Sequence, residues 1–147
     1  MVSPIRRTDR EKSFMRTPEE VKRELVQQWL AKAGQDFGLA EHLVAERSPY
    51  LLAVGFHAQQ AAEKYLKAFL VHHQCAFQKS HDIDELLDRA ATLDKAFAES
   101  LRTAVALNPY AVDERYPGDY PDITENDAVE ALALAKMVRD AILGQAF

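Results

Sequence analysis

The chain has 147 residues, 48% of them hydrophobic and 28% charged, so it holds enough apolar material for one hydrophobic core and too little for two. Five Gly and six Pro are few for this length, which disfavours the Gly-rich turns of a barrel or sandwich and favours helices. The single cysteine, Cys75, excludes an internal disulfide, and the net charge of −5 disfavours strong nonspecific binding to duplex nucleic acid.

The first sixteen residues differ in charge from the rest of the chain. They carry five basic and two acidic side chains, a balance of +3, which leaves −8 for residues 17–147. Such an arm either contacts phosphate groups or is a solvated tail, and the acidic remainder favours a flexible tail. The arm lacks the apolar stretch of a secretory signal, and no later run suits a membrane span, so we expect a cytoplasmic protein without membrane contact. We therefore predict an arm, residues 1–16, and one domain, residues 17–147.

Two long helices are predicted first. Thr17 can cap the first, Pro18 suits its opening position, and Glu20 can complete a capping box. This helix should run to about Arg47, and its apolar residues recur every three or four positions: Val21, Leu25, Trp29, Ala33, Phe37, Ala40 and Val44. The second helix should span residues 50–74, with a wide apolar face made of Val54, Ala58, Ala61, Ala62, Tyr65, Leu66, Phe69 and Leu70.

Two glycines stand inside the first helix, at Gly34 and Gly38. Each costs about 1 kcal/mol relative to alanine in a helix interior, so a close approach of a neighbouring helix would explain them. The alanines of the second helix are the expected neighbours, in an antiparallel hairpin with a short connecting turn.

Shorter helices are predicted after the hairpin. Asp82 begins one of them, with Glu85 at the capping-box position and Ile83, Leu86, Leu87 and Ala90 as its buried stripe. Another should run from about Asp94 to Asn108, because Pro109 disfavours helical geometry at the preceding residue. A last helix, capped by Thr124, should end near Gly144.

Residues 109–123 form a fifteen-residue connection rich in proline and tyrosine. Connections of this length are unusual in compact domains and are often functional. Tyr110, Arg115 and Tyr116 combine aromatic rings with a guanidinium group, which suits stacking on bases and bidentate contact with phosphate. The same residue types are favoured at protein interfaces, so closure of the bundle or of a dimer is an equally good interpretation.

Polar residues also line one edge of the second helix. His57, Gln60 and Lys64 follow an i, i+3, i+7 spacing beside the apolar face, so they can face a shared site. The alternative interpretation is a solvated helix flank on which Glu63 and Lys67 form an i, i+4 ion pair, and the pattern alone favours that alternative.

His81 and Asp82 stand where a loop enters the third helix. Asp82 is a natural N-cap, and His81 can form a local hydrogen bond. A histidine beside a carboxylate can also act as an acid or base near neutral pH, although adjacent residues need not contact each other. Both interpretations stay open.

Three separated segments, together with Tyr50, resemble the HEPN (higher eukaryotes and prokaryotes nucleotide-binding) domain family. Residues 54–68 read VGFHAQQAAEKYLKA, residues 80–83 read SHDI, and residues 110–117 read YAVDERYP. The resemblance covers about residues 18–144. It implies a compact bundle of about five helices that is commonly a homodimer, binds nucleotides and often partners a small nucleotidyltransferase.

Some HEPN proteins are metal-independent ribonucleases and toxins that use an arginine followed, after four to six residues, by a histidine. Arg115 is followed at those positions by Tyr120, Pro121 and Asp122, so the ribonuclease pattern is missing. Acid or base catalysis would then depend on His57 or His81. We therefore rank binding above catalysis and assign no catalytic residue.

The sequence thus predicts an all-α, up-and-down, HEPN-like bundle with a long Pro/Tyr-rich loop before its last helix. The first functional hypothesis is an accessory domain for a nucleotide or single-stranded RNA, acting with a nucleotidyltransferase in a toxin–antitoxin-like pair. A metal-independent endoribonuclease toxin and a pure interaction or dimerisation module are the alternatives. No cofactor and no metal site are expected, and one cleft should be lined by His57, Gln60, Lys64, His81, Asp82, Tyr110, Arg115 and Tyr116.

Overall fold

The computed structural model describes residues 16–111, 122–145 and 147. Within these ranges the chain forms five α-helices, one 3-10 helix and no strand. The elements are α2 (Pro18–Ala45), α3 (Leu51–His72), α4 (Ile83–Ala91), α5 (Lys95–Ser100), η1 (Arg102–Ala111) and α6 (Glu125–Leu143). The predicted all-α bundle is confirmed.

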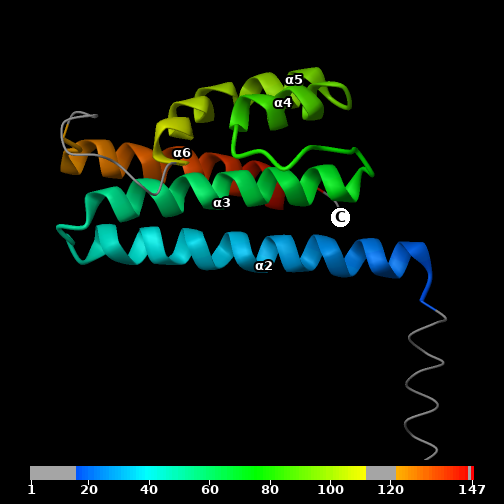
Figure 1. The fold of residues 1–147 in the computed structure, drawn as a ribbon, viewed down its shortest axis with the longest axis horizontal. Coiled ribbons are helices and arrows are strands. Elements are labelled where there is room, and N and C mark those ends of the chain that lie inside the picture. The colour runs from blue at the N-terminus through cyan, green and yellow to red at the C-terminus, as the bar shows by residue number, and fades with distance from the viewer. Residues whose placement is uncertain (1–15, 112–121, 146) are drawn as a thin grey trace, which may run out of the picture.

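Helix α3 is the centre of the bundle (Figure 1). It lies antiparallel to α2 and also packs on α6, while α4 and η1 cover a further side. Its predicted apolar face is confirmed, since all eight of the named residues are buried. The turn that joins α2 to α3 begins at Arg47, which adopts a positive φ of 51°. Ser48 N then donates to Leu43 O at 2.9 Å, so this hydrogen bond satisfies a carbonyl at the end of α2.

Helix α2 begins as predicted, with Thr17 Oγ1 accepting a hydrogen bond from Glu20 N at 3.1 Å. Its buried face was predicted incorrectly near this end. Val21 and Leu25 are exposed, and Val26 and Leu30 pack inward in their place. The sequence offers apolar residues on two faces here, and only one of them can lie against α3.

The proposed reason for the two glycines of α2 is also wrong. A Cβ atom added at Gly38 would meet nothing within 4 Å, and one added at Gly34 would meet only the Tyr65 hydroxyl, at 3.9 Å. The alanines of α3 therefore do not require glycine on α2.

The single helix predicted for residues 94–108 is instead two elements. Helix α5 ends at Ser100, and the chain continues as η1, in which Ala104 N bonds Leu101 O at 3.0 Å. Pro109 lies inside η1 rather than beyond its end, so the predicted stop at Asn108 is wrong. Ten residues of 3-10 helix are uncommon, because i to i+3 hydrogen bonds have poorer geometry than those of an α-helix.

The Asn108 side chain holds η1 against the start of α4 by accepting one hydrogen bond and donating another. Its Oδ1 accepts from Ile83 N at 2.9 Å and its Nδ2 donates to Asp82 Oδ1 at 2.8 Å. Asp82 is the N-cap of α4, as predicted, but it accepts from Asp84 N rather than sharing a capping box with Glu85.

Helix α6 starts at a complete capping box between Thr124 and Asp127 and is followed by Gly144, as predicted. The pKa of Asp127 lies below its ordinary value because its carboxylate accepts hydrogen bonds from Thr124. A depressed folded-state pKa means that this cap stabilises the fold above the ordinary aspartate pKa and loses that contribution as the pH falls.

Several sequence predictions lie outside the described residues. These are the basic arm, apart from Arg16, and the Pro/Tyr-rich segment that contains Arg115 and Tyr116. None of the described helices is long and apolar enough to cross a membrane.

Candidate functional site

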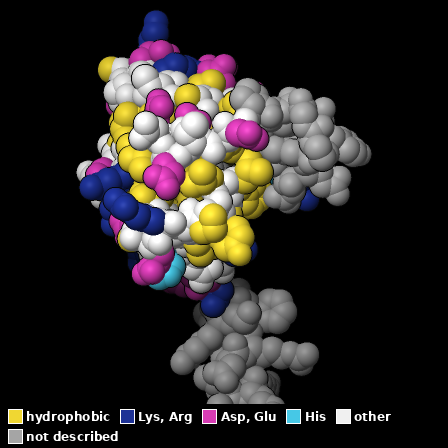
Figure 2. All heavy atoms as spheres, turned by 90° about the vertical axis from the view of Figure 1, so that its left-hand side faces the viewer, with side chains coloured by type: hydrophobic (Ala, Val, Ile, Leu, Met, Phe, Trp, Pro, Cys, Tyr) yellow, Lys and Arg dark blue, Asp and Glu magenta, His cyan; other side chains and the backbone are white. Residues whose placement is uncertain are grey.

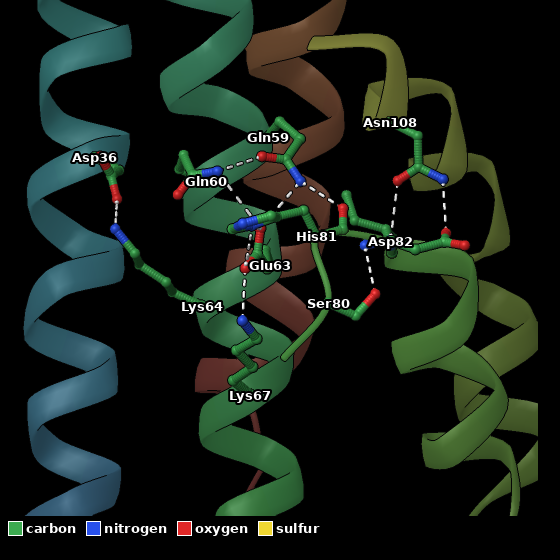
Figure 3. Close-up of polar contacts among 11 residues, drawn as sticks. Asp36, Gln59, Gln60, Glu63, Lys64, Lys67, Ser80, His81, Asp82 and Asn108 are labelled. Carbon is green, nitrogen blue, oxygen red and sulfur yellow. Dashed lines mark hydrogen bonds and ion pairs between the residues drawn. The ribbon is translucent and has the colours of Figure 1, made fainter. Parts of the chain in front are cut away.

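The polar edge of α3 is tied to α2 through one carboxylate. Asp36 Oδ1 lies 2.9 Å from His57 Nδ1, and Asp36 Oδ2 forms an ion pair with Lys64 Nζ (Figure 3 shows the pair with Lys64). The three side chains are only 14–26% exposed. This edge is therefore a partly buried, paired surface rather than a freely solvated flank.

A second carboxylate, Glu63, is the centre of a larger network (Figure 3). Gln59 Nε2 donates to Glu63 Oε2 at 3.1 Å, Lys67 Nζ to Oε1 at 2.6 Å, and His81 Nδ1 lies 3.0 Å from Oε2. Gln60 Nε2 donates to Gln59 Oε1 at 2.7 Å and thus joins this network to the outer edge of the helix. The predicted Glu63–Lys67 pair is confirmed, but both residues are buried, so its predicted solvated setting is wrong.

The Lys67 ammonium group has aromatic neighbours as well as a carboxylate. It lies 5.4 Å from the ring centroid of Trp29 and 5.8 Å from that of Phe77. Both distances suit a cation–π interaction, which gains strength where water is excluded. Within the described part of the chain, every buried side-chain N or O atom has a hydrogen-bond partner.

His81 is held over Glu63 by the loop before α4. Gln59 Nε2 donates to the backbone oxygen of His81 at 3.0 Å, and Ser80 Oγ accepts from Asp82 N at 3.1 Å. The His81 side chain is 69% exposed although its Nδ1 faces a carboxylate that is 3% exposed. Because Nδ1 contacts the carboxylate, Nε2 is the ring nitrogen left for a ligand, so this pair orients an accessible histidine.

Tyr110 lies at the end of η1, with its ring against Gly55 of α3. A Cβ atom at Gly55 would lie 2.4 Å from Tyr110 Cδ1 and 2.8 Å from Cγ, far inside van der Waals contact. Gly55 is therefore the residue that lets η1 approach α3.

We expect Gly55→Ala to destabilise the fold by about 1–3 kcal/mol, because the ring of Tyr110 and the backbone of η1 must move. Gly34→Ala is the matched control, since its new methyl group would meet only the Tyr65 hydroxyl, at 3.9 Å, and should stabilise α2 by about 1 kcal/mol. Urea denaturation of both variants measures the difference. Equal effects of the same sign would contradict the packing of Tyr110 on Gly55.

Four of the eight predicted site residues share one face, which we call the α3 polar face: His57, Gln60, Lys64 and His81. Asp82 turns toward α4 and Asn108, and Tyr110 covers Gly55. Arg115 and Tyr116 lie outside the described residues.

Sequence analysis missed Asp36, Gln59 and the burial of Glu63. Their signal was weak: Gln59, Glu63 and Lys67 recur at i, i+4, i+8 between the apolar positions of α3.

A pocket of about 180 Å³ with mixed polar and apolar walls lies at the end of the bundle where the turn between α2 and α3 meets the start of α6. Hydrophobic side chains gather on this end (Figure 2), and the exposed ones include Tyr50, Leu52 and Val129. The pocket shares no residue with the α3 polar face.

In residues 16–111, 122–145 and 147, no group of three or more His, Cys, Asp or Glu side chains could hold a metal ion.

The helical bundle and its buried polar network define the class of domain. The sequence model of the HEPN domain matches residues 26–145, so this chain belongs to the HEPN domain family. This is a family of nucleotide-binding and ribonuclease-type domains. Neither a curated protein nor a solved structure matched the chain.

Proposed function

We propose that the α3 polar face binds the phosphate groups of a nucleotide or of single-stranded RNA. The observation that carries this proposal is the pair of histidine–carboxylate contacts, His57 with Asp36 and His81 with Glu63, gathered from α2, α3 and the loop before α4. Each carboxylate orients an imidazole, and the amide of Gln60 lies beside the second pair. Orientation of this kind lowers the entropy lost when the groups bind a ligand.

The charges of the face suit a ligand that binds through histidine. Asp36 and Glu63 already neutralise Lys64 and Lys67, so the two histidines are the groups of this face that are left to contact a ligand. A phosphate oxygen near His81 would accept a charge-assisted hydrogen bond, typically worth about 1.5–3 kcal/mol. Arg115 and Tyr116 complete the proposed site as a phosphate contact and a stacking surface.

Calorimetric titration with nucleoside triphosphates and with short single-stranded RNAs tests the proposal. We expect His81→Ala, His57→Ala and Arg115→Ala each to weaken binding by about tenfold or more, a loss of at least about 1.4 kcal/mol. Lys136→Ala removes an exposed positive charge from α6 and serves as the control with unchanged affinity. Absence of heat at millimolar ligand, or equal affinity of all four variants, would refute the proposal.

The arrangement in the cell is a further part of the proposal. The domain would act as a homodimer and as the partner of a small nucleotidyltransferase, in a toxin–antitoxin-like pair. Gel filtration tests whether the chain is a homodimer. A pull-down with a nucleotidyltransferase encoded beside this chain tests whether the two proteins bind each other. A chain that binds such a partner but no nucleotide would be an interaction module instead.

A metal-independent endoribonuclease is the second candidate, and the same two histidines favour it. One imidazole oriented by Asp36 and another by Glu63 could serve as base and acid, the roles that RNA cleavage requires. RNA cleavage in EDTA that disappears in both His57→Ala and His81→Ala would support it. Intact RNA and unimpaired growth on expression would remove it.

A further inference from the structure

The outer face of α2 carries a regular stripe that none of the described residues covers. We call it the outer stripe: Val21, Leu25, Gln28, Lys32, Gln35, Leu39 and His42, all of them exposed. The spacing alternates between four and three residues throughout, which is the heptad spacing of the contact line between two packed helices. Three large apolar side chains on it, those of Val21, Leu25 and Leu39, are 41–43% exposed.

Two further observations indicate that the stripe meets another helix. Among the described elements, α2 contacts only α3 and α6, so its outer side has no helical neighbour. Beside the stripe, on one flank, stand Ala31 and Gly38, and a Cβ atom at Gly38 would meet open space. A glycine in a helix interior costs about 1 kcal/mol relative to alanine, and no contact in the described part of the chain requires this one.

We propose that the outer stripe is the contact between two copies of this chain, with the two α2 helices antiparallel. The proposal rests on the homodimer named in the proposed function and specifies its interface. A twofold axis at Lys32 pairs Leu25 with the partner's Leu39, each seven residues from the axis. It also brings Gln28 to within one residue, about 1.5 Å, of the level of the partner's Gln35, and by symmetry the reverse. Apolar thus faces apolar and amide faces amide, as an isologous interface requires.

The antiparallel direction follows from two features of α2. Antiparallel helices align their dipoles favourably, whereas parallel helices do not. The flank with Ala31 and Gly38 would also meet the same flank of the partner, so that the two backbones approach where both are small. Two positions are mismatched. The ammonium group of Lys32 would stand beside the partner's Lys32 at the axis, and Val21 would lie at about the level of the partner's His42.

This pairing has a consequence for the proposed ligand. Asp36 lies on the flank of α2 opposite Gly38, where it holds His57 and Lys64. In an antiparallel pair the Asp36 flanks of both copies lie on the same side of the dimer. Each Asp36 would stand about 6 Å along its helix from the axis, at 1.5 Å per residue, so both polar faces would border one surface.

Sedimentation equilibrium of the full chain, wild type and four variants, tests the interface. Leu25→Glu and Leu39→Lys should each raise the dimer dissociation constant about tenfold or more, because each places two charges in an apolar contact. The double variant should recover most of the wild-type affinity, since the new carboxylate would face the partner's new ammonium group. Lys32→Gln should tighten the dimer by relieving the repulsion at the axis. All substituted side chains are exposed, and circular dichroism checks the fold of each variant.

Three results would overturn the proposal: a monomeric wild type, a dimer indifferent to the single variants, or single-variant losses that the double variant does not recover. The last would indicate parallel helices, in which Leu25 faces its own copy. Calorimetry on the Leu25→Glu monomer separates this claim from the proposed function. If the variants do not affect dimerisation but the chain binds nucleotide, the interface is wrong and the proposed site on the α3 polar face is retained. If the variants affect dimerisation as expected but the chain binds no nucleotide, the proposed function is wrong and the interface is retained.

Discussion

Glu63→Ala is expected to destabilise the fold by about 5 kcal/mol, the upper end of the cost of breaking a buried ion pair. The substitution removes the carboxylate that pairs with Lys67, whose side chain is 9% exposed. Among the described residues, the rings of Trp29 and Phe77 then remain beside that ammonium group. The substitution also removes one acceptor of the Gln59 amide, which is fully buried. One truncation therefore leaves Lys67 without its carboxylate and leaves Gln59 with one of its two N–H bonds, since Nε2 still donates to His81 O. Each lost partner carries a desolvation cost.

Urea denaturation measures this loss, with two controls. Glu63→Gln keeps the shape of the side chain but not its charge, so we expect an intermediate destabilisation. Glu130→Ala removes an exposed carboxylate from α6 and should change the free energy of unfolding by less than about 0.5 kcal/mol. If Glu63→Ala were no more destabilising than Glu130→Ala, the stabilising role assigned to the buried hydrogen bonds of Glu63 would be contradicted.

Lys67→Met should destabilise the fold less, by about 3 kcal/mol, the lower end of the same range. Here the partner left behind is Glu63, which keeps hydrogen bonds from Gln59 and His81. Methionine also fills much of the lysine volume and packs well against the rings of Trp29 and Phe77. The comparison of the two variants by urea denaturation tests the asymmetry. A larger loss in Lys67→Met than in Glu63→Ala would contradict the assignment of several donors to Glu63.

The helical periodicity predicted most of the fold because one buried face repeats along each long helix. The apolar face of α3 was predicted correctly on that basis. The prediction was wrong at Val21 and Leu25, where α2 has apolar residues on two faces and periodicity cannot say which face is covered. It was also wrong at Pro109, because a 3-10 helix tolerates a proline that a regular α-helix would exclude.

The site was less accessible to sequence analysis. Spacing placed His57, Gln60 and Lys64 on one edge of α3, which the structure confirms as a shared face. Their partners come from other segments, Asp36 on α2 and His81 before α4, and spacing along one helix carries no information about contacts between helices. Glu63 was assigned to solvent because charged residues are rarely fully buried unless they are paired, and its pairing becomes visible only in three dimensions.

Nitrogen-detected NMR of the histidine side chains during titration with a nucleoside triphosphate tests the central claim most directly. The imidazole resonances of His57 and His81 should move along the same saturation curve, because one ligand meets both oriented rings. Those of His42, on the far side of α2, should stay fixed. Unmoved resonances of His57 and His81 at saturating ligand, or movement of all the histidines alike, would contradict a nucleotide site on the α3 polar face.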